Sequence, residues 1–213
     1  MQAAPSRPIP PLAALCRDHP LARDLLLSTL FACLTALGAQ IRIPLPVVPV
    51  TGQVFFVLLT GGFLGGRLAA ISMAEYLALG AAGLPVFAGG SGGLAAFLGP
   101  TAGYLLAFPV AAYLAGSLIQ RCRWRSWLAT LAAMLIGVVV IWAGGVVWLA
   151  GLGYLLSTAG LPPLPGWLPF LRAGEGHLWR QALLVGLFPF IWVDLAKAIL
   201  AAQIIHFPHR RLR

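Results

Sequence analysis

The sequence predicts an all-α polytopic membrane protein with six transmembrane helices. Apolar side chains make up 60% of the 213 residues and charged ones only 9%, whereas soluble proteins carry about 25% charged residues. A membrane span needs about 20 predominantly apolar residues, and the apolar residues gather in six segments of that kind, the second and third being short. These segments cover residues 25–41, 53–66, 68–84, 100–120, 126–157 and 179–206.

The six segments form one integral membrane domain over residues 1–213. Residues 1–24 are polar and proline-rich without a continuous apolar stretch, so we expect no cleaved signal peptide. Residues 25–206 are the predicted six-helix core, and residues 207–213 are a basic tail. We place the protein in the inner membrane of a bacterium with both termini in the cytoplasm. Ten arginines then lie on the cytoplasmic side of this membrane, and three lie on its outer side: Arg42, Arg172 and Arg180. This distribution follows the positive-inside rule.

The first two outer loops have an unusual composition. Residues 42–53 alternate proline with branched apolar residues, and residues 83–93 are rich in glycine and equally apolar. Irregular backbone is tolerated at membrane depth only when it is buried in protein or lines a cavity. We therefore expect both loops to fold inward over a site; a flexible hairpin is the other interpretation of the glycine-rich loop. Glycines at 61–66 predict the break between the second and third helices.

The sixth segment contains the only lysine of the chain, Lys197, three residues after Asp194. A charge at bilayer depth costs about 2.5–3.5 kcal/mol on insertion scales, so both groups need a partner. Residues at i and i+3 share a helix face, and the pair could simply neutralise itself. Every other basic residue is an arginine, however, and a compact ammonium with rotatable donors suits contact with a solute. The pair is the first candidate binding site.

Three further polar residues are candidates for the same site. Gln53 begins the second helix and either binds a solute or caps loop backbone. Tyr104 either forms a wall of the site or anchors the helix at the membrane interface. Glu75 is an acid within the third segment with no evident cationic neighbour, and intramembrane acids are functional candidates.

Catalysis, cofactors and nucleic acid are not predicted. The cysteines and histidines do not have metal-ligand spacing, and the sequence has no Walker A, GxSxG or HExxH motif. We therefore predict no catalytic residue, no metal and no cofactor, and regard an enzyme as the weakest class. The net charge of +9 comes from arginines beside apolar segments, which are topology signals rather than a nucleic-acid surface. We expect membrane lipid, and not nucleic acid, to contact the surface of the protein.

The order of motifs resembles the BioY family, the biotin-binding membrane component of energy-coupling factor transporters. The matching stretches run from the first helix to the sixth: ALGAQIRIPLP at 36–46, VPVTGQ at 48–53, GLPVFAGGSGG at 83–93, LGPTAGY at 98–104 and DLAK at 194–197. The resemblance implies a six-helix subunit that captures biotin outside the cell and delivers it inward. It also implies a coupling protein and two ATPase subunits as partners.

The resemblance matches Asp194 and Lys197 to the polar pair that such proteins direct at the cargo, and the chemistry of biotin suggests contacts for each residue. Biotin combines an apolar thioether ring, a ureido group and a carboxylate tail. Asp194 could accept from the ureido N–H groups and Lys197 donate to the ureido carbonyl, both as charge-assisted hydrogen bonds, while Arg42 is the candidate for the tail. The expected contacts also include Gln53, Tyr104, Gly89, Gly90 and Glu75.

The first helix carries an Ala-x-x-x-Ala motif at Ala32 and Ala36, which the resemblance assigns to docking on the coupling protein. Small residues four apart allow helices to approach closely, so packing within the chain is the alternative. The sequence departs from the family pattern in two places: Trp192 and Val193 stand where Pro-Gly often precedes the Asp-Leu-x-Lys motif, and the chain contains no asparagine to contact the ureido ring. The alternative function is a self-sufficient biotin facilitator or secondary transporter without ATPase partners.

Overall fold

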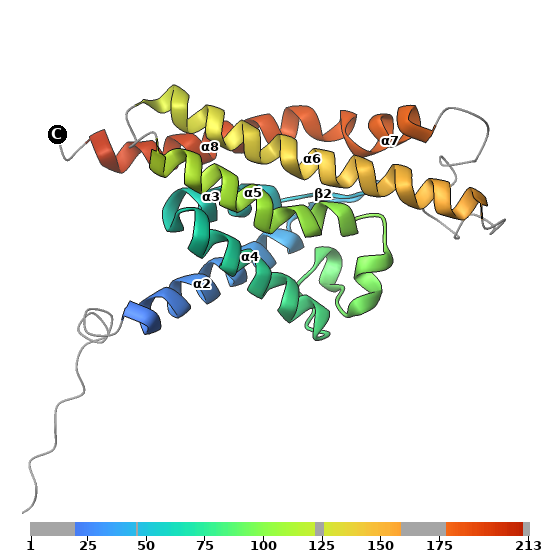
Figure 1. Cartoon of the computed structure of the whole chain (residues 1–213), viewed down its shortest axis with the longest axis horizontal. Coiled ribbons are helices and arrows are strands. Elements are labelled where there is room, and N and C mark those ends of the chain that lie inside the picture. The colour runs from blue at the N-terminus through green and yellow to red at the C-terminus, as the bar shows by residue number, and fades with distance from the viewer. Residues whose placement is uncertain (1–19, 46, 122–125, 159–177, 211–213) are drawn as a thin grey trace, which may run out of the picture.

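The computed structural model describes residues 20–45, 47–121, 126–158 and 178–210. These residues form a mainly helical bundle with one short pair of strands (Figure 1). The longer helices are α2 (Pro20–Gln40), α3 (Gln53–Leu64), α4 (Gly66–Ala81), α5 (Ala102–Arg121), α6 (Trp127–Thr158), α7 (Leu178–Gly186) and α8 (Ile191–Arg210). The short elements are β1 (Arg42–Ile43), β2 (Val50–Thr51) and the 3₁₀ turns η1 (Ala88–Gly90), η2 (Leu94–Leu98) and η3 (Phe188–Phe190).

The helices have the length and surface of a polytopic membrane protein. Four helical stretches of the described residues are long and apolar enough to cross a membrane: Pro20–Gln40, Ala102–Arg121, Trp127–Leu155 and Leu178–His206. Large apolar side chains are widely exposed, among them Leu21 at 79% and Trp192 at 76%. Apolar surface of this extent is the kind that lipid covers.

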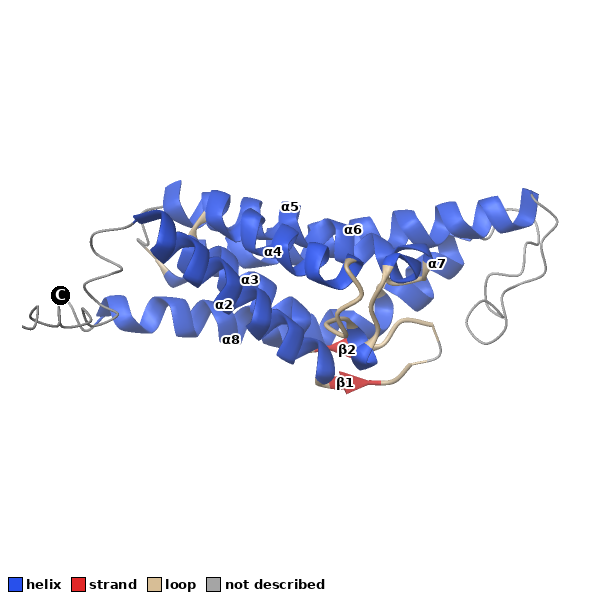
Figure 2. Ribbon diagram, turned by 90° about the horizontal axis from the view of Figure 1, so that it is seen from below, coloured by secondary structure: helices blue, strands red, loops and turns tan. Residues whose placement is uncertain are grey.

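Helix α5 lies at the centre of the bundle. It packs against α3, α4 and α6, and α6 also runs along α7 and α8 (Figures 1 and 2). Glycines allow two of these approaches, because a Cβ atom on Gly116 of α5 would lie 2.6 Å from the carbonyl oxygen of Gly61 in α3. A Cβ atom on Gly144 of α6 would lie 2.8 Å from the oxygen of Gly103 in α5. The helix backbones therefore touch where larger residues would separate them.

The predicted break between the second and third segments is confirmed. The prediction that the sixth segment forms one unbroken helix is wrong. Gly65 separates α3 from α4 with φ of 76°, a conformation that glycine adopts without steric cost. The segment predicted as one helix over 179–206 is divided into α7, η3 and α8. Pro189 lies within this break, and proline interrupts a helix because it has no N–H donor.

The proline-rich loop between α2 and α3 contains a short hairpin. Arg42 pairs with Thr51 and Ile43 with Val50 in antiparallel register. The Gly52 N–H then donates to the carbonyl oxygens of Gly38 and Ile41, both at 2.9 Å. The hairpin is therefore fastened to the end of α2, next to the start of α3.

Candidate functional site

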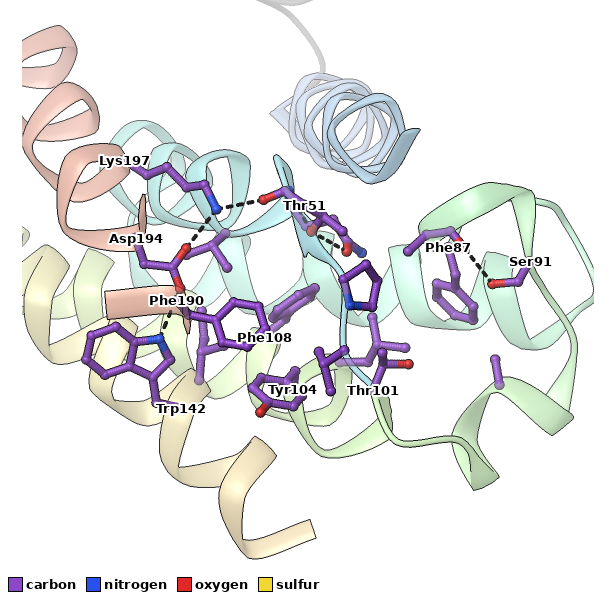
Figure 3. Close-up of a pocket in the computed structure, with 18 residues that line it drawn as sticks. Thr51, Phe87, Ser91, Thr101, Tyr104, Phe108, Trp142, Phe190, Asp194 and Lys197 are labelled. Carbon is purple, nitrogen blue, oxygen red and sulfur yellow. Dashed lines mark hydrogen bonds and ion pairs between the residues drawn. The ribbon is translucent and has the colours of Figure 1, made fainter. Parts of the chain in front are cut away.

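A cavity of about 190 Å³ lies between the proline-rich loop, the glycine-rich loop and helices α5, α6 and α8 (Figure 3). Its aromatic lining comes from Phe87, Tyr104, Phe108, Trp142 and Phe190. Its polar lining comes from Thr51, Gln53, Ser91, Thr101, Asp194 and Lys197. Ligand sites are typically apolar with a few placed polar groups, and this cavity has that character.

Asp194 owes its position to the break between α7 and α8. The break starts a new helix at Ile191, which places Asp194 in the first turn of α8, where the positive end of the helix dipole favours a carboxylate. Asp194 is only 2% exposed. Its Oδ1 accepts a hydrogen bond from Lys197 Nζ at 2.7 Å, and its Oδ2 accepts one from Trp142 Nε1 at 3.0 Å (Figure 3). The buried charge is therefore bonded at both oxygens.

Lys197 does more than neutralise Asp194. Its Nζ also donates to the backbone oxygen of Thr51 at 2.7 Å (Figure 3), which connects α8 to the β1–β2 hairpin. An ammonium has three donors, and among the described residues only these two acceptors are bonded to it. One donor remains available to a ligand in the cavity.

A chain of hydrogen bonds continues from the hairpin to the glycine-rich loop. The Thr51 hydroxyl donates to Gln53 Oε1 at 2.7 Å, and Gln53 Nε2 donates to the Tyr76 hydroxyl at 2.6 Å. The Tyr76 hydroxyl donates in turn to the backbone oxygen of Val86 at 3.0 Å. Gln53 is buried and lines the cavity, and its hydrogen bonds connect the two loops through Tyr76.

Tyr104 forms part of the cavity wall. Its ring packs near that of Phe190, with centroids 6.1 Å apart. Its hydroxyl donates to the backbone oxygen of Gly186 at 2.6 Å, at the end of α7. Tyr104 is buried, which favours the cavity-wall interpretation over the interfacial one. Its hydrogen bond to Gly186 connects α5 to the break in the sixth segment.

Three predicted residues lie at the edge of the cavity rather than in its lining. Arg42 is exposed on β1, and its guanidinium occupies the space beside Gly89, where a Cβ atom would collide with it. Gly89 and Gly90 have φ of 73° and 72° and form the turn between Ala88 and Ser91, which do line the cavity. The glycines therefore shape the loop and leave the contact surface to their neighbours.

The structure does not bring Glu75 into the cavity. Its Oε2 accepts a hydrogen bond from the Ser28 hydroxyl at 2.5 Å, and its Oε1 accepts one from the Thr29 hydroxyl at 2.6 Å. These contacts lie between α2 and α4, and Glu75 is absent from the residues that line the described cavity. Its hydrogen-bonding partners among the described residues are hydroxyl groups of another helix.

Ala32 and Ala36, which are predicted to dock on a coupling protein, pack within the chain. Ala32 is 1% exposed and belongs to the buried core, and Ala36 packs against the same core. This burial favours packing within the chain, and the docking role stays a prediction. The exposed side chains of α2 include Leu26, Leu30, Cys33 and Leu37.

Sequence reasoning missed Trp142 and the break at Pro189. Trp142 lies in the middle of an apolar segment, and a buried indole N–H usually finds a hydrogen-bond partner, so its position was a usable signal. A proline inside a helical pattern likewise predicts a kink or an end. Among the described residues, no cluster of three or more His, Cys, Asp or Glu side chains could hold a metal ion.

Comparisons with known proteins agree on one family. The sequence profile of the BioY family matches residues 10–213. The "Probable biotin transporter BioY" of Pyrococcus horikoshii is 38% identical over 184 residues, covering 86% of this chain and 94% of that protein. The "Biotin transporter BioY" of Thermotoga maritima is 37% identical over 182 residues, covering 85% and 93%.

A solved structure supports the same assignment. The crystal structure of "the S-component for biotin from an ECF-type ABC transporter" aligns with a TM-score of 0.69 and 27% identity, covering 89% of this chain and 92% of that one. The profile match, the sequence relatives and the shared fold extend over nearly all of the chain. This chain, a multi-pass membrane protein, therefore belongs to the BioY family.

Proposed function

We propose that this chain takes up biotin as the substrate-capturing subunit of an energy-coupling factor transporter. Its relatives in Pyrococcus horikoshii and Thermotoga maritima carry the name biotin transporter, and the similar solved structure is described as the S-component for biotin. The observation that carries the proposal is the cavity with the buried Asp194–Lys197 pair on its wall. A transporter subunit needs such a solute site and no catalytic group.

The polar groups of the cavity suit the ureido ring of biotin. A carboxylate has about four lone-pair sites, and Asp194 uses two of them for Lys197 and Trp142, so its free sites can accept from the ureido N–H groups. The remaining Lys197 donor can bond the ureido carbonyl. The apolar ring would then lie among the aromatic side chains of the lining, including Phe108 and Tyr104.

The carboxylate tail of biotin would extend toward the loops. Arg42 lies at that edge beside Gly89, and its guanidinium can bond a carboxylate through two parallel donors. Gly90 continues the turn without a side chain. Gln53 completes the polar side of the site through its position on the cavity wall. The absence of asparagine from the sequence leaves ureido recognition to the charged pair.

The same proposal includes topology and partners. The six spans are α2, α3, α4, α5, α6 and the divided pair α7 and α8, with the two loops folded inward from the outer side. Both termini lie in the cytoplasm of a cell whose inner membrane holds the protein. The partners are a coupling protein and two ATPase subunits. The likeness to an ECF-type component favours this assembly over a self-sufficient facilitator.

Equilibrium binding to detergent-purified protein tests the ligand. We expect biotin to bind much more tightly than lipoic acid, which has a similar acyl tail and an apolar sulfur-containing ring but no ureido group. A buried polar site rejects an analogue that leaves its groups unpaired. Equal affinity for the two compounds would refute recognition of the ureido group by the Asp194–Lys197 pair.

Two further experiments test the assembly and the orientation. Purification from a native membrane in mild detergent should recover a coupling protein and two ATPases; biotin uptake in cells lacking all three would contradict the proposed assembly.

The proposed orientation predicts that a variant retaining Cys122 as its only cysteine reacts with a membrane-permeant thiol reagent and resists an impermeant one in intact cells. Cys122 lies outside the described residues. Labelling of Cys122 by the impermeant reagent would contradict the proposed orientation and indicate the opposite one.

A further inference from the structure

A second polar cleft lies at the opposite end of the helices from the candidate site. Its volume is about 530 Å³, and it shares no lining residue with the first cavity. It is formed where α2 and α4 begin and where α3 and α5 end, whereas the loops of the candidate site join the other ends of these helices. The lining residues are Arg23, Asp24, Leu64, Arg67, Leu68, Tyr113, Ser117, Gln120 and Arg121.

The cleft has an excess of positive charge. Arg23 forms an ion pair with Asp24, with Nη2 and Oδ1 3.0 Å apart, so the one carboxylate of the lining is already occupied. Arg67 and Arg121 come from different helices, α4 and α5, and neither has a hydrogen-bonding or ion-pair partner among the described residues. Two guanidinium groups are therefore free to bind an anion, and each can bond phosphate oxygens through parallel donors.

The start of α4 adds to this charge. Helix α4 has 16 residues, and its N-cap is Gly65, which supplies no side-chain cap. The Gly66 N–H donates to Gln120 Oε1 at a long 3.4 Å. The first-turn amides of a helix carry the positive end of its dipole, so this end of α4 favours an anion in the same cleft.

Apolar surface leads from the cleft along two helices toward the other end of the bundle. On α2, Leu26 and Leu30 follow Arg23 at spacings of three and seven residues and are 55% and 52% exposed. On α5, Val110 and Leu106 precede Tyr113 at the same spacings and are 51% and 48% exposed. Residues three, four and seven apart share a helix face. A ligand in the cleft thus has polar contacts at one end and lipid-exposed apolar tracks beside it.

We propose that this cleft binds the headgroup of an anionic phospholipid, with its phosphate on Arg67 and Arg121 and its acyl chains along α2 or α5. Basic pockets between transmembrane helices suit such headgroups. The apolar tracks favour a lipid over a soluble phosphate, because a free ion would leave them without a role. This site is independent of the proposed biotin site.

The test uses delipidated full-length protein in non-ionic detergent, titrated with lipids and observed by native mass spectrometry. The probes are phosphatidylglycerol, phosphatidylcholine with the same acyl chains, and glycerol 3-phosphate as the soluble headgroup. We expect the unmodified protein to bind phosphatidylglycerol most tightly. Because each arginine near a membrane surface contributes about fivefold, the double variant Arg67→Gln/Arg121→Gln should weaken phosphatidylglycerol binding roughly 25-fold.

The matched control is Arg180→Gln, which removes an exposed arginine from α7 outside both cavities. It should leave phosphatidylglycerol affinity unchanged, and all variants should keep the melting temperature of the unmodified protein. Equal binding of the two lipids, or unchanged phosphatidylglycerol affinity in the double variant, would overturn the proposal. So would equally tight binding of glycerol 3-phosphate, which would indicate a soluble anion. Loss of coupling-protein assembly in the double variant without any lipid preference would assign the cleft to that partner instead.

Discussion

Replacing Asp194 by alanine is the most informative single change in the candidate site. The substitution leaves the indole N–H of Trp142 without its acceptor and leaves the Lys197 ammonium with the Thr51 carbonyl as its remaining described partner. Removing one member of a buried ion pair costs about 3–5 kcal/mol, because the other charge stays buried. We expect the Asp194→Ala variant to lose stability of that order, seen as a lower melting temperature in detergent.

Biotin binding should fall for a separate reason. A hydrogen bond to a charged group contributes about 1.5–3 kcal/mol, which corresponds to roughly a tenfold to 150-fold rise in dissociation constant. Isothermal titration of biotin into purified protein measures this change. The matched control is Asp24→Ala, which removes an acid from an exposed pair with Arg23. Exposed pairs contribute little to stability, so biotin affinity should be unchanged in that variant.

The double variant Asp194→Ala/Lys197→Ala separates recognition from self-neutralisation. Removing both charges eliminates the stranded ammonium, so the melting temperature should recover relative to Asp194→Ala alone. Biotin affinity should not recover, because both the acceptor and the donor for the ureido group are gone. A double variant that binds biotin as tightly as the unmodified protein would refute the site assignment and leave the pair as a structural neutraliser.

Three other substitutions test the surroundings of the site. Trp142→Phe removes the hydrogen bond to Asp194 Oδ2 and should weaken biotin binding in calorimetry by less than Asp194→Ala does; an equal or larger loss would mean that the indole contacts the ligand itself. Ala32→Leu overfills a position that is 1% exposed and should lower stability by about 1–3 kcal/mol; unchanged melting with lost coupling-protein assembly would restore its docking role. Glu75→Gln gives up an acceptor for Ser28 or Thr29 and should lower the melting temperature while biotin affinity stays constant, so a loss of affinity would return Glu75 to the binding site.

Local chemistry explains why some features were predictable from the sequence. The break at Gly65 follows from glycine tolerance of positive φ. Asp194 and Lys197 had to meet because residues at i and i+3 share a helix face, and their contact at 2.7 Å agrees with that expectation. The two apolar loops had to lie against protein, and Val48 and Phe87 from these loops do line the cavity.

Contacts between distant segments explain what could not be predicted. The partners of Glu75 lie 46 and 47 residues away on another helix, and no spacing rule identifies them. Arg42 shares its hairpin with Thr51, yet its side chain lies at the rim while the Thr51 carbonyl faces Lys197. The side of a loop that meets a cavity depends on how the loop packs, which composition alone does not specify.

The glycine contacts of α5 determine which parts of the molecule can move to admit a solute. Sliding α5 past α3 or α6 would push a neighbouring Cβ atom into the carbonyl oxygen of Gly61 or Gly103, since no flexible side chain separates these backbones. We therefore expect helices α3, α5 and α6 to shift together. A passage into the cavity would then form by displacement of the hairpin and of the turn at Gly89, and amide hydrogen exchange should be slow along α5 and fast in that turn.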